Sequence, residues 1–237
     1  MRCGRGMLTM VVIAFVLVSG QGYAQTPDRA LENPLFLAEV GDTRLVYASY
    51  ATGAEQLLVS YVEYDEFASG YGAFTFLTSG KEEEGGTVSF VAVKEYDNTN
   101  FGIGIYRGNG VTSLDAGLSY GFSKVDVRVG VHDVPLNRWQ ENKDQINVSL
   151  GASVDITDCV RVGVDARPGD AWEFDFHSQI EVTPNLATRV SVGFEQTKWQ
   201  DAGLEVWLSR NQVLIHIGYT LNQDLTSDFR LGLGFRF

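Results

Sequence analysis

Three histidines are the residues of this chain best suited to metal binding or general base catalysis: His132, His177 and His216. They are widely separated in the sequence and lack the close ligand spacing of zinc sites. His177 precedes Ser178, which places a base next to a nucleophile. Consecutive residues of a β-strand point to opposite faces, however, so this pair cannot form the hydrogen bond that activates a serine. The sequence therefore predicts no metal site, no catalytic residue and no enzymatic activity, and the histidines are expected to be solvated.

Two other features exclude further classes of chemistry. Gly102, Ile103 and Gly104 are not followed by the helix that a phosphate-binding glycine loop requires, so no cofactor is expected. The whole chain has 18 basic and 30 acidic side chains, and the basic ones are not clustered. Nucleic acid is therefore not an expected partner, because phosphate contacts need clustered lysine and arginine.

Residues 1–24 have the three parts of a secretory signal peptide. Arg2 and Arg5 form a charged start, residues 7–19 form an apolar stretch, and residues 22–24 form a small-residue cleavage site. The sequence therefore predicts export of the protein and removal of this segment.

The mature chain would begin at Gln25 and carry 16 basic and 30 acidic side chains, a net charge of −14. Cys159 would be its one cysteine, so no internal disulfide is expected. After the signal, no apolar run reaches the roughly 18 residues that a membrane-spanning helix needs. We divide the mature chain into an N-terminal segment, residues 25–41, and a β-structured region, residues 42–237. If the β-structured region closes into a barrel, the N-terminal segment could plug its lumen, add a strand through residues 35–40, or remain outside the barrel in the periplasm.

The β-structured region alternates apolar with polar or small residues at a period of two, which is typical of strands with two different faces. At the C-terminus one face carries Phe229, Leu231, Leu233, Phe235 and Phe237, and the other carries Arg230, Gly232, Gly234 and Arg236. The same division recurs in most of the segments upstream, which are separated by short turns.

The turn signals divide the region into about fourteen strands, with twelve as the alternative. The predicted ranges are 42–51, 55–66, 71–79, 87–96, 100–107, 111–121, 124–134, 145–155, 159–167, 171–182, 187–197, 203–209, 213–220 and 228–237. All five prolines fall outside these ranges in the mature chain, as expected if each strand donates hydrogen bonds on both sides. An even number of strands places both termini on one side, which in bacterial barrels is the periplasm.

Two architectures use such alternation: a soluble β-sandwich or barrel with its apolar residues inside, and a membrane barrel with its apolar residues outside. A soluble sandwich fills its polar face with Lys, Glu and Thr, whereas this polar face is rich in glycine and serine with isolated charges. The lysines fall in or beside turns or near the end of a segment: Lys81, Lys94, Lys124, Lys143 and Lys198. A lysine facing mid-membrane lipid would cost about 2–4 kcal/mol, so this distribution favours the membrane barrel.

The outward aromatic residues fall at two levels, as do the aromatic belts of membrane barrels. With a periplasmic C-terminus, the turns assign five to the outer rim and four to the periplasmic rim. The outer set is Trp139, Trp172, Trp199, Tyr219 and Phe229, and the periplasmic set is Phe101, Tyr120, Phe122 and Phe237.

The signal peptide, the alternating hairpins over nearly all of the mature chain and the last strand, which ends in an aromatic residue, resemble bacterial outer-membrane β-barrels of the porin-like kind. The resemblance implies a transmembrane, antiparallel, up-and-down barrel in the outer membrane, with both termini periplasmic and lipid around the wall. It also implies that the barrel-assembly machinery recognises the last strand through Leu233, Phe235 and Phe237. No particular porin family and no oligomeric state is indicated.

The inward face of the predicted barrel carries the candidate lumen-lining residues. Small residues there, mostly glycines, are expected to widen the lumen, and charges of both signs favour hydrated polar solutes. The charged and histidine positions are Asp115, Asp126, Arg128, His132, Arg161, Asp165, Arg167, Glu173, Asp175, His177, Glu181, Arg189, Glu195, Glu205, His216, Arg230 and Arg236.

One hairpin allows a register to be predicted. If residues 183–186 form the turn, Glu181 lies beside Arg189 as an ion pair, and Asp175 lies beside Glu195 near the outer mouth. Two like charges at the mouth attract cations or need a positive neighbour such as Arg167. Together with the net charge, this arrangement predicts a weak preference for cations.

These features favour a porin-like channel for passive diffusion of small hydrophilic solutes, with no chemical step. One alternative is a structural or envelope-interaction barrel whose lumen is closed by side chains and the N-terminal segment. Another is a lipid-modifying outer-membrane enzyme. Stepwise conductance in planar bilayers distinguishes the channel from the structural barrel, and loss of acyl chains from lipid would indicate the enzyme.

Overall fold

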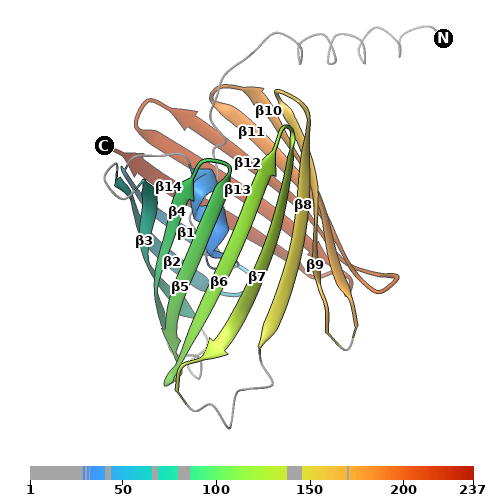
Figure 1. The fold of residues 1–237 in the computed structure, drawn as a ribbon. Coiled ribbons are helices and arrows are strands. Elements are labelled where there is room, and N and C mark those ends of the chain that lie inside the picture. The colour runs from blue at the N-terminus through green and yellow to red at the C-terminus, as the bar shows by residue number, and fades with distance from the viewer. Residues whose placement is uncertain are drawn as a thin grey trace, which may run out of the picture.

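The structure is a computed structural model that describes residues 29, 31, 33–40, 44–65, 69–79, 86–137, 146–169 and 171–237. Within these ranges, fourteen antiparallel strands close into a barrel in which each strand pairs with its sequence neighbours and β14 pairs with β1 (Figure 1). The predicted all-β, up-and-down barrel is confirmed, and the twelve-strand alternative is wrong. The predicted signal peptide, residues 1–24, lies outside the described residues.

The strands agree closely with the predicted ranges, except that β12 begins five residues earlier than predicted. Their bounds are β1 Arg44–Ala51, β2 Gln56–Asp65, β3 Gly70–Ser79, β4 Thr87–Tyr96, β5 Thr99–Gly108, β6 Val111–Phe122, β7 Val125–Pro135, β8 Asn147–Thr157, β9 Val160–Arg167, β10 Glu173–Thr183, β11 Leu186–Glu195, β12 Lys198–Arg210, β13 Val213–Asn222 and β14 Ser227–Arg236. Between β5 and β6, Asn109 and Gly110 both have positive φ, 52° and 75°, as a tight type I′ hairpin turn requires.

The barrel has two rims, which we name by the chain terminus. At the C-terminal rim, the N–H of Phe237 donates to the carbonyl of Arg44, so the start of β1 and the end of β14 lie together. The opposite rim, which we call the far rim, holds the turn at residues 109–110 and the ends of β9 and β11. If the C-terminal rim is periplasmic, as the sequence predicts, the far rim faces outwards.

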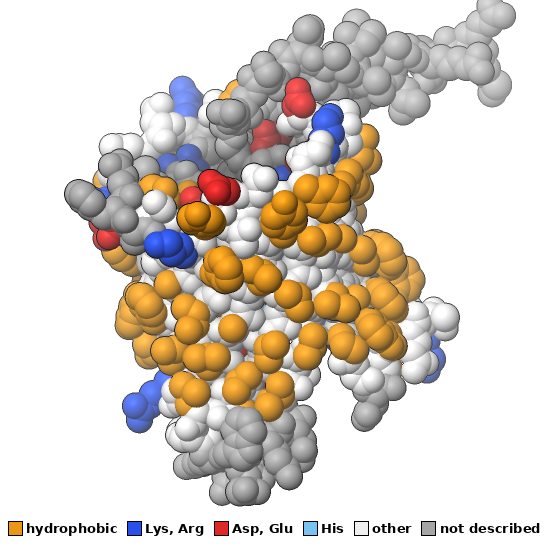
Figure 2. Space-filling model, in the orientation of Figure 1, with side chains coloured by type: hydrophobic (Ala, Val, Ile, Leu, Met, Phe, Trp, Pro, Cys, Tyr) orange, Lys and Arg blue, Asp and Glu red, His pale blue; other side chains and the backbone are white. Residues whose placement is uncertain are grey.

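The apolar residues of the wall point away from the barrel interior. Val127 is 40% exposed and Phe235 50% exposed, whereas their strand neighbours Arg128 and Gly234 are buried. Figure 2 shows the apolar side chains as a broad surface over the middle of the wall, with charged residues toward both rims. A soluble barrel would pack these residues together inside, so the orientation is that of a membrane barrel. No helix of the described residues is long and apolar enough to cross a membrane.

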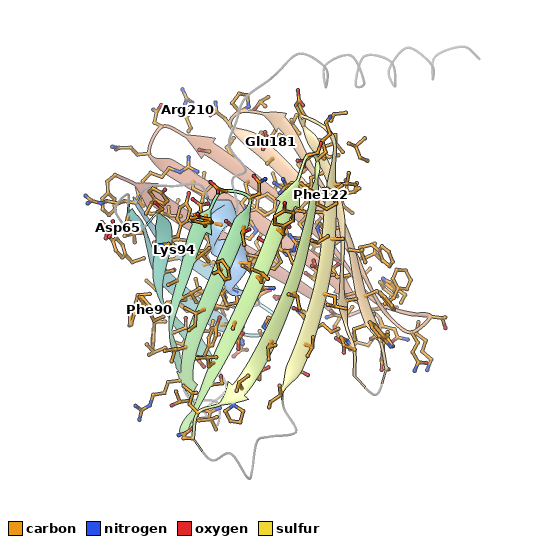
Figure 3. All side chains as sticks on the ribbon, in the orientation of Figure 1. Asp65, Phe90, Lys94, Phe122, Glu181 and Arg210 are labelled. Carbon is orange, nitrogen blue, oxygen red and sulfur yellow. The ribbon has the colours of Figure 1, made fainter. Side chains whose placement is uncertain are left out.

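Charged and aromatic side chains mark the two rims. Asp65, Lys94 and Arg210 lie toward the C-terminal rim, whereas Phe90 points outward from the wall between the rims (Figure 3). Tyr120 and Phe122 stack at the C-terminal rim with their ring centroids 6.3 Å apart. The other predicted rim residues are exposed or half-exposed near strand ends: Phe101, Trp172, Trp199, Tyr219, Phe229 and Phe237. The predictions for Lys81, Trp139 and Lys143 lie outside the described residues.

A short 3-10 helix, η2 (Pro34–Val40), lies inside the barrel (Figure 1). It packs against the inner face of the wall from β3 to β6. The helix packs on two glycines, Gly102 of β5 and Gly117 of β6, which are directly opposite each other in the sheet. A Cβ atom at Gly102 would lie 2.9 Å from the Pro34 side chain, and one at Gly117 would lie 2.9 Å from Leu35. These glycines therefore make room for the helix. The sequence analysis expected inward glycines to widen the lumen, and for these two that expectation is wrong.

An apolar cluster fills the lumen next to the helix. Leu37 and Val40 of η2 pack with inward side chains of the wall, and every member of the cluster is buried: Leu45, Tyr47, Leu58, Val62, Ala73, Val91, Val93, Ala187, Trp207 and Leu214. The sequence analysis named charged residues and glycines as the lumen lining and did not identify this inward apolar cluster, whose wall residues belong to β1–β4 and β11–β13. Burial of this much apolar surface anchors η2 to the wall.

Candidate functional site

The predicted lumen residues lie on the strand positions that alternate with the outward apolar residues. Fourteen of the seventeen are buried or half-buried, and three are exposed near the far rim: Arg167, Glu173 and Glu195. All seventeen are among the described residues. Their role in transport stays a prediction, but the structure shows which of them lie together.

A cavity of about 610 Å³ lies between η2 and the inner face of β7–β12. Its polar lining includes five carboxylates, Asp165, Glu173, Asp175, Glu195 and Asp201, and two arginines, Arg29 and Arg167. The Phe36 ring of η2 forms part of the opposite wall, and the guanidinium of Arg29 lies 4.1 Å from its centroid. The cavity is therefore polar on its strand side and acidic toward the far rim.

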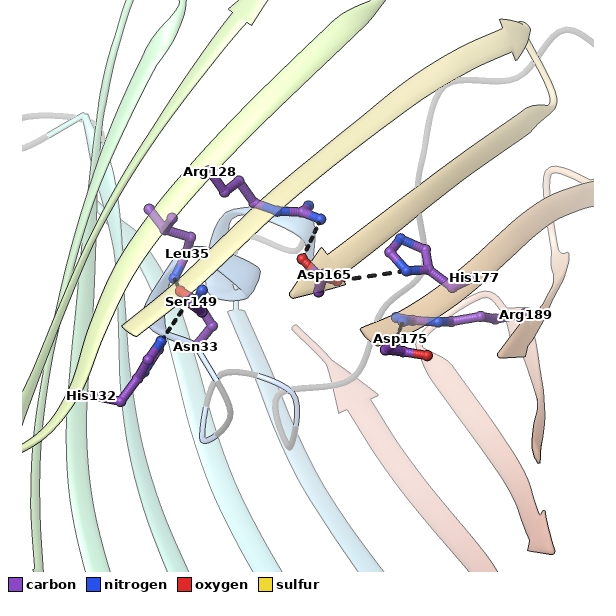
Figure 4. A network of polar contacts seen from close by, with 9 residues as sticks. All are labelled: Asn33, Leu35, Arg128, His132, Ser149, Asp165, Asp175, His177 and Arg189. Atoms are coloured by element: carbon purple, nitrogen blue, oxygen red, sulfur yellow. Dashed lines mark hydrogen bonds and ion pairs between the residues drawn. The ribbon is translucent and has the colours of Figure 1, made fainter. Parts of the chain in front are cut away.

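Asp165 of β9 lines this cavity and contacts side chains of two other strands, β7 and β10 (Figure 4). Arg128 Nη2 of β7 donates to Asp165 Oδ1 at 3.1 Å, and His177 Nδ1 of β10 lies 3.6 Å from Asp165 Oδ2. Asp175 belongs to the next contact along the wall, where its Oδ2 accepts from Arg189 Nη2 of β11 at 3.3 Å. The two ion pairs thus place charges of both signs on four strands of the inner face, β7, β9, β10 and β11.

The predicted register of the β10–β11 hairpin is wrong. Arg189 is opposite Gln179, two residues from its predicted partner Glu181, and Glu195 is opposite Glu173 and not Asp175. A bulge between Glu181 and Thr183 tightens the turn to two residues and shifts the pairing. A shift of two residues leaves every side chain on its predicted face, so alternation alone could not detect it. Glu173 also lies opposite Arg167 of β9, the positive neighbour that the sequence analysis named.

Asp165, Asp175 and His177 have ligand atoms within 4.8 Å of one another, a spacing that could hold a metal ion. Arg128 and Arg189 already bind the two carboxylates. Their positive charge opposes the binding of a cation there. We therefore keep the prediction that the protein has no metal site.

His216 of β13 is not solvated as predicted, because its side chain is fully buried. Its Nδ1 is 2.9 Å from the Tyr47 hydroxyl, and its Nε2 is 3.5 Å from Glu205 Oε1. The Trp207 ring stacks on the imidazole, with centroids 5.4 Å apart. This group sits in the apolar cluster and holds β1, β12 and β13 together.

His132 of β7 is also buried, and its ring contacts side chains of both neighbouring strands, β6 and β8. Its Nδ1 is 3.0 Å from Asp115 Oδ2 of β6, and its Nε2 is 2.7 Å from Ser149 Oγ of β8. An aspartate, a histidine and a serine connected in this order form the arrangement that activates a nucleophilic serine. The sequence analysis missed it because it weighed the histidine next to a serine in the sequence, and Ser149 was not among its candidate residues.

The remaining predicted positions lie apart from the cavity. Arg161 forms an ion pair with Asp155 of β8 at 2.7 Å, near the C-terminal rim. Arg236 donates to the Ser209 hydroxyl at the same rim. Leu233, Phe235 and Phe237, the predicted assembly signal, point outward with exposed fractions of 46%, 50% and 62%. The structure thus leaves the apolar face of the last strand accessible from outside the barrel.

The turn between β13 and β14 adds negative charge at the far rim. The Thr226 hydroxyl and the Thr226 N–H donate to Asp224 Oδ1, and these hydrogen bonds hold the pKa of that carboxyl below its usual range. With Asp201, Asp224 also lines a shallow depression on this rim. The entrance to the cavity is therefore acidic over the residues that the structure describes.

Comparison with known proteins supports the fold. No protein-family model matches the sequence, and no curated protein is similar enough to match it. Among solved structures, the outer membrane protein Omp33 of Acinetobacter baumannii matches with a TM-score of 0.62 at 12% identity, over 82% of this chain and 96% of that one. A mutant of Rh. blastica porin matches with a TM-score of 0.51 at 7% identity, over 82% of this chain and 98% of that one. The chain thus has a porin-like outer-membrane barrel fold.

Proposed function

We propose that this protein is an outer-membrane channel through which small hydrophilic solutes diffuse passively. The observation that carries the proposal is the polar cavity of about 610 Å³ that remains beside the lumenal helix, inside a wall whose outer face is apolar. A closed barrel satisfies every wall hydrogen bond in lipid, and a polar lumen provides a path for water and solutes. The likeness to Omp33 and to Rh. blastica porin is consistent with this function.

The path through the lumen is narrow because η2 and the apolar cluster occupy the side of β1–β5. Solutes would pass along β6–β12, where the inner face is charged. Charged groups of both signs replace part of the hydration of a polar solute and disfavour an apolar one. The expected substrates are therefore small and hydrophilic, of the size of simple ions and short polar metabolites.

The charges around the cavity support a weak preference for cations. Five carboxylates line it, against the lining residues Arg29 and Arg167 and the ion-pair partners Arg128 and Arg189. Among the described residues around the cavity, the negative groups therefore outnumber the positive groups by one. The acidic far rim raises the local concentration of cations further.

The experiment that tests the channel is conductance of the purified, refolded protein in planar bilayers. A channel gives stepwise current increments that fall when neutral polymers small enough to enter the lumen are added. In a KCl gradient, the sign of the reversal potential should show that K⁺ passes more readily than Cl⁻. Heat-modifiable, folded protein without any current steps would contradict the proposal.

The second candidate is a structural or envelope-interaction barrel with an occluded lumen. The observation that favours it is the anchoring of η2, in which Leu35, Phe36, Leu37 and Val40 are all buried inside the barrel. In that case the full-length protein would not conduct, whereas a variant in which η2 cannot bind the wall would. Measuring both proteins distinguishes the two functions.

The partners that we propose follow from the outer surface. Outer-membrane lipid covers the apolar wall, and the barrel-assembly machinery would recognise β14 through Leu233, Phe235 and Phe237. All three side chains are exposed on one face of the strand. Replacing Phe237 and Phe235 by serine should slow insertion into the outer membrane in cells. The same variant should still refold in detergent, and this result would separate a defect in assembly from a loss of stability.

A further inference from the structure

Asp115, His132 and Ser149 come from three consecutive strands and meet on the inner face of the barrel. A carboxylate only accepts hydrogen bonds, so the proton between Asp115 and His132 belongs to Nδ1 of the imidazole. The lone pair of Nε2 then accepts from the Ser149 hydroxyl, 2.7 Å away. Ser149 therefore faces a base that can take its proton, and the base is held by an acid on its other side.

The backbone is distorted where the acid is placed. The pairing of β6 with β7 shifts between Leu114 and Ala116, so Asp115 lies in a β-bulge opposite His132 and Asp133. Asp133 adopts a φ of 57°, in the left-handed region that non-glycine residues rarely occupy, and its N–H donates to Asp115 Oδ1 at 2.8 Å. Bulges and strained residues often re-aim side chains at functional sites. Both oxygens of Asp115 are thus engaged, one by the backbone and one by the histidine.

Gly130 makes the contact between the base and the serine possible. It lies on β7 directly opposite Ser149. A Cβ atom at position 130 would lie 2.7 Å from both His132 Nε2 and Ser149 Oγ. A larger residue would push at least one of these two side chains away, so the glycine leaves the space in which the hydrogen bond forms.

The serine and the histidine border the lumenal cavities. His132 and Ser149 line the cavity of about 610 Å³, and His132 and Asp115 line a neighbouring one of about 380 Å³. Asn33, from the segment before η2, lines the larger cavity as well. Its Oδ1 accepts from the N–H of Leu35. Its side-chain amide nitrogen is a hydrogen-bond donor of the kind that stabilises an oxyanion.

We propose that Ser149 is the nucleophile of a lumenal esterase site, with His132 as its general base and Asp115 as the positioning residue. The carboxylates around the cavity repel anions, so the substrates are small uncharged or positively charged carboxylic esters. This inference does not rest on the channel function, because it needs only solvent access to the cavity.

The reaction balances within the three residues, the ester and water. Ser149 Oγ bonds to the carbonyl carbon while its proton passes to His132 Nε2. The carbon–oxygen bond to the alcohol then breaks, and the leaving alkoxide takes that proton. Water repeats the sequence on the acyl-serine, so that the carboxylic acid is released and the serine regenerated. Asp115 stays ionised and stabilises the imidazolium while it exists.

The first test is covalent labelling of the folded wild-type barrel with a fluorophosphonate, followed by peptide mass spectrometry. Ser149 Oγ displaces fluoride from phosphorus, and the adduct should be found on the peptide that contains Ser149. Ser191 is the matched control, because it lines the same cavity. Label on Ser149 but not on Ser191 is the expected result. Folded protein with no label on Ser149 would overturn the proposal.

The second test is hydrolysis of p-nitrophenyl acetate by variants whose folding is checked by heat modifiability. Ser149→Ala and His132→Gln should each lower the rate by about 100-fold or more, as loss of a nucleophile or base does. Gly130→Ala should lower it as well, by separating the two atoms, while Ser153→Ala should leave it unchanged, because Ser153 is a buried serine of the same strand that does not line the larger cavity. A wild-type rate equal to that of folded Ser149→Ala would refute the esterase site, whatever the conductance of either protein.

Discussion

Replacing Leu37 by alanine should release the lumenal helix from the wall. Leu37 is fully buried, and it packs in the cluster that includes Tyr47 and Trp207. Truncation of a buried leucine to alanine costs about 2–5 kcal/mol. Most of this cost falls on the docked state of η2, because the strands keep their own hydrogen bonds. At about 1.4 kcal/mol for each factor of ten, the undocked population should rise by roughly 30-fold to several thousand-fold.

Single-channel recording measures that population. The wild-type protein should remain at a low conductance level, with rare transitions to a wider one, and Leu37→Ala should occupy the wider level far more often. The matched control is Leu204→Ala on β12, because Leu204 faces outward and is 47% exposed. It should leave the occupancy unchanged. If Leu37→Ala and wild type occupied the wide level equally, η2 would not be what narrows the lumen.

Three further changes have expected outcomes. The double variant Glu173→Gln and Glu195→Gln removes two facing carboxylates from the mouth, so the reversal potential in a KCl gradient should move toward zero; no movement would show that they do not set selectivity. Gly117→Leu should clash with the helix and raise conductance, whereas Gly121→Ala should not, because a Cβ there lies 3.8 Å from its nearest neighbours. Trp207→Ala should cost about 3–5 kcal/mol of stability and lower the temperature at which the barrel unfolds in heat-modifiability gels, and an unchanged temperature would contradict the role of the apolar cluster.

The strand number and the orientation of each face could be predicted from the sequence because both follow from the two-residue period. Val127 and Phe235 reveal their face through their neighbours along the strand. The register between strands is harder to predict from the alternation, because the bulge at the β10–β11 turn shifted the pairing of Arg189 by two residues without changing its face.

The interior was predicted less well because its packing is non-local. Gly102 and Gly117 look like residues that widen a pore, but they are seats for a helix that lies more than sixty residues earlier in the chain. Asp115 meets His132 through a bulge, and the bulge depends on the pairing of β6 with β7. A search for a serine two residues from the partner of each inward histidine in the next strand would have found Ser149, provided that the register was known.

The measurement that tests the account most directly compares two adjacent residues of β11. Val190 points outward and is 49% exposed, while Ser191 lines the lumenal cavity. After replacement of Cys159 by alanine, a single cysteine is placed at either position and the protein is reconstituted in lipid vesicles. The account predicts that Ser191→Cys reacts with a charged, water-soluble thiol reagent, and that Val190→Cys, carrying a fluorophore, is quenched by brominated lipid. Fast aqueous labelling of Val190→Cys together with an inert Ser191→Cys would contradict it.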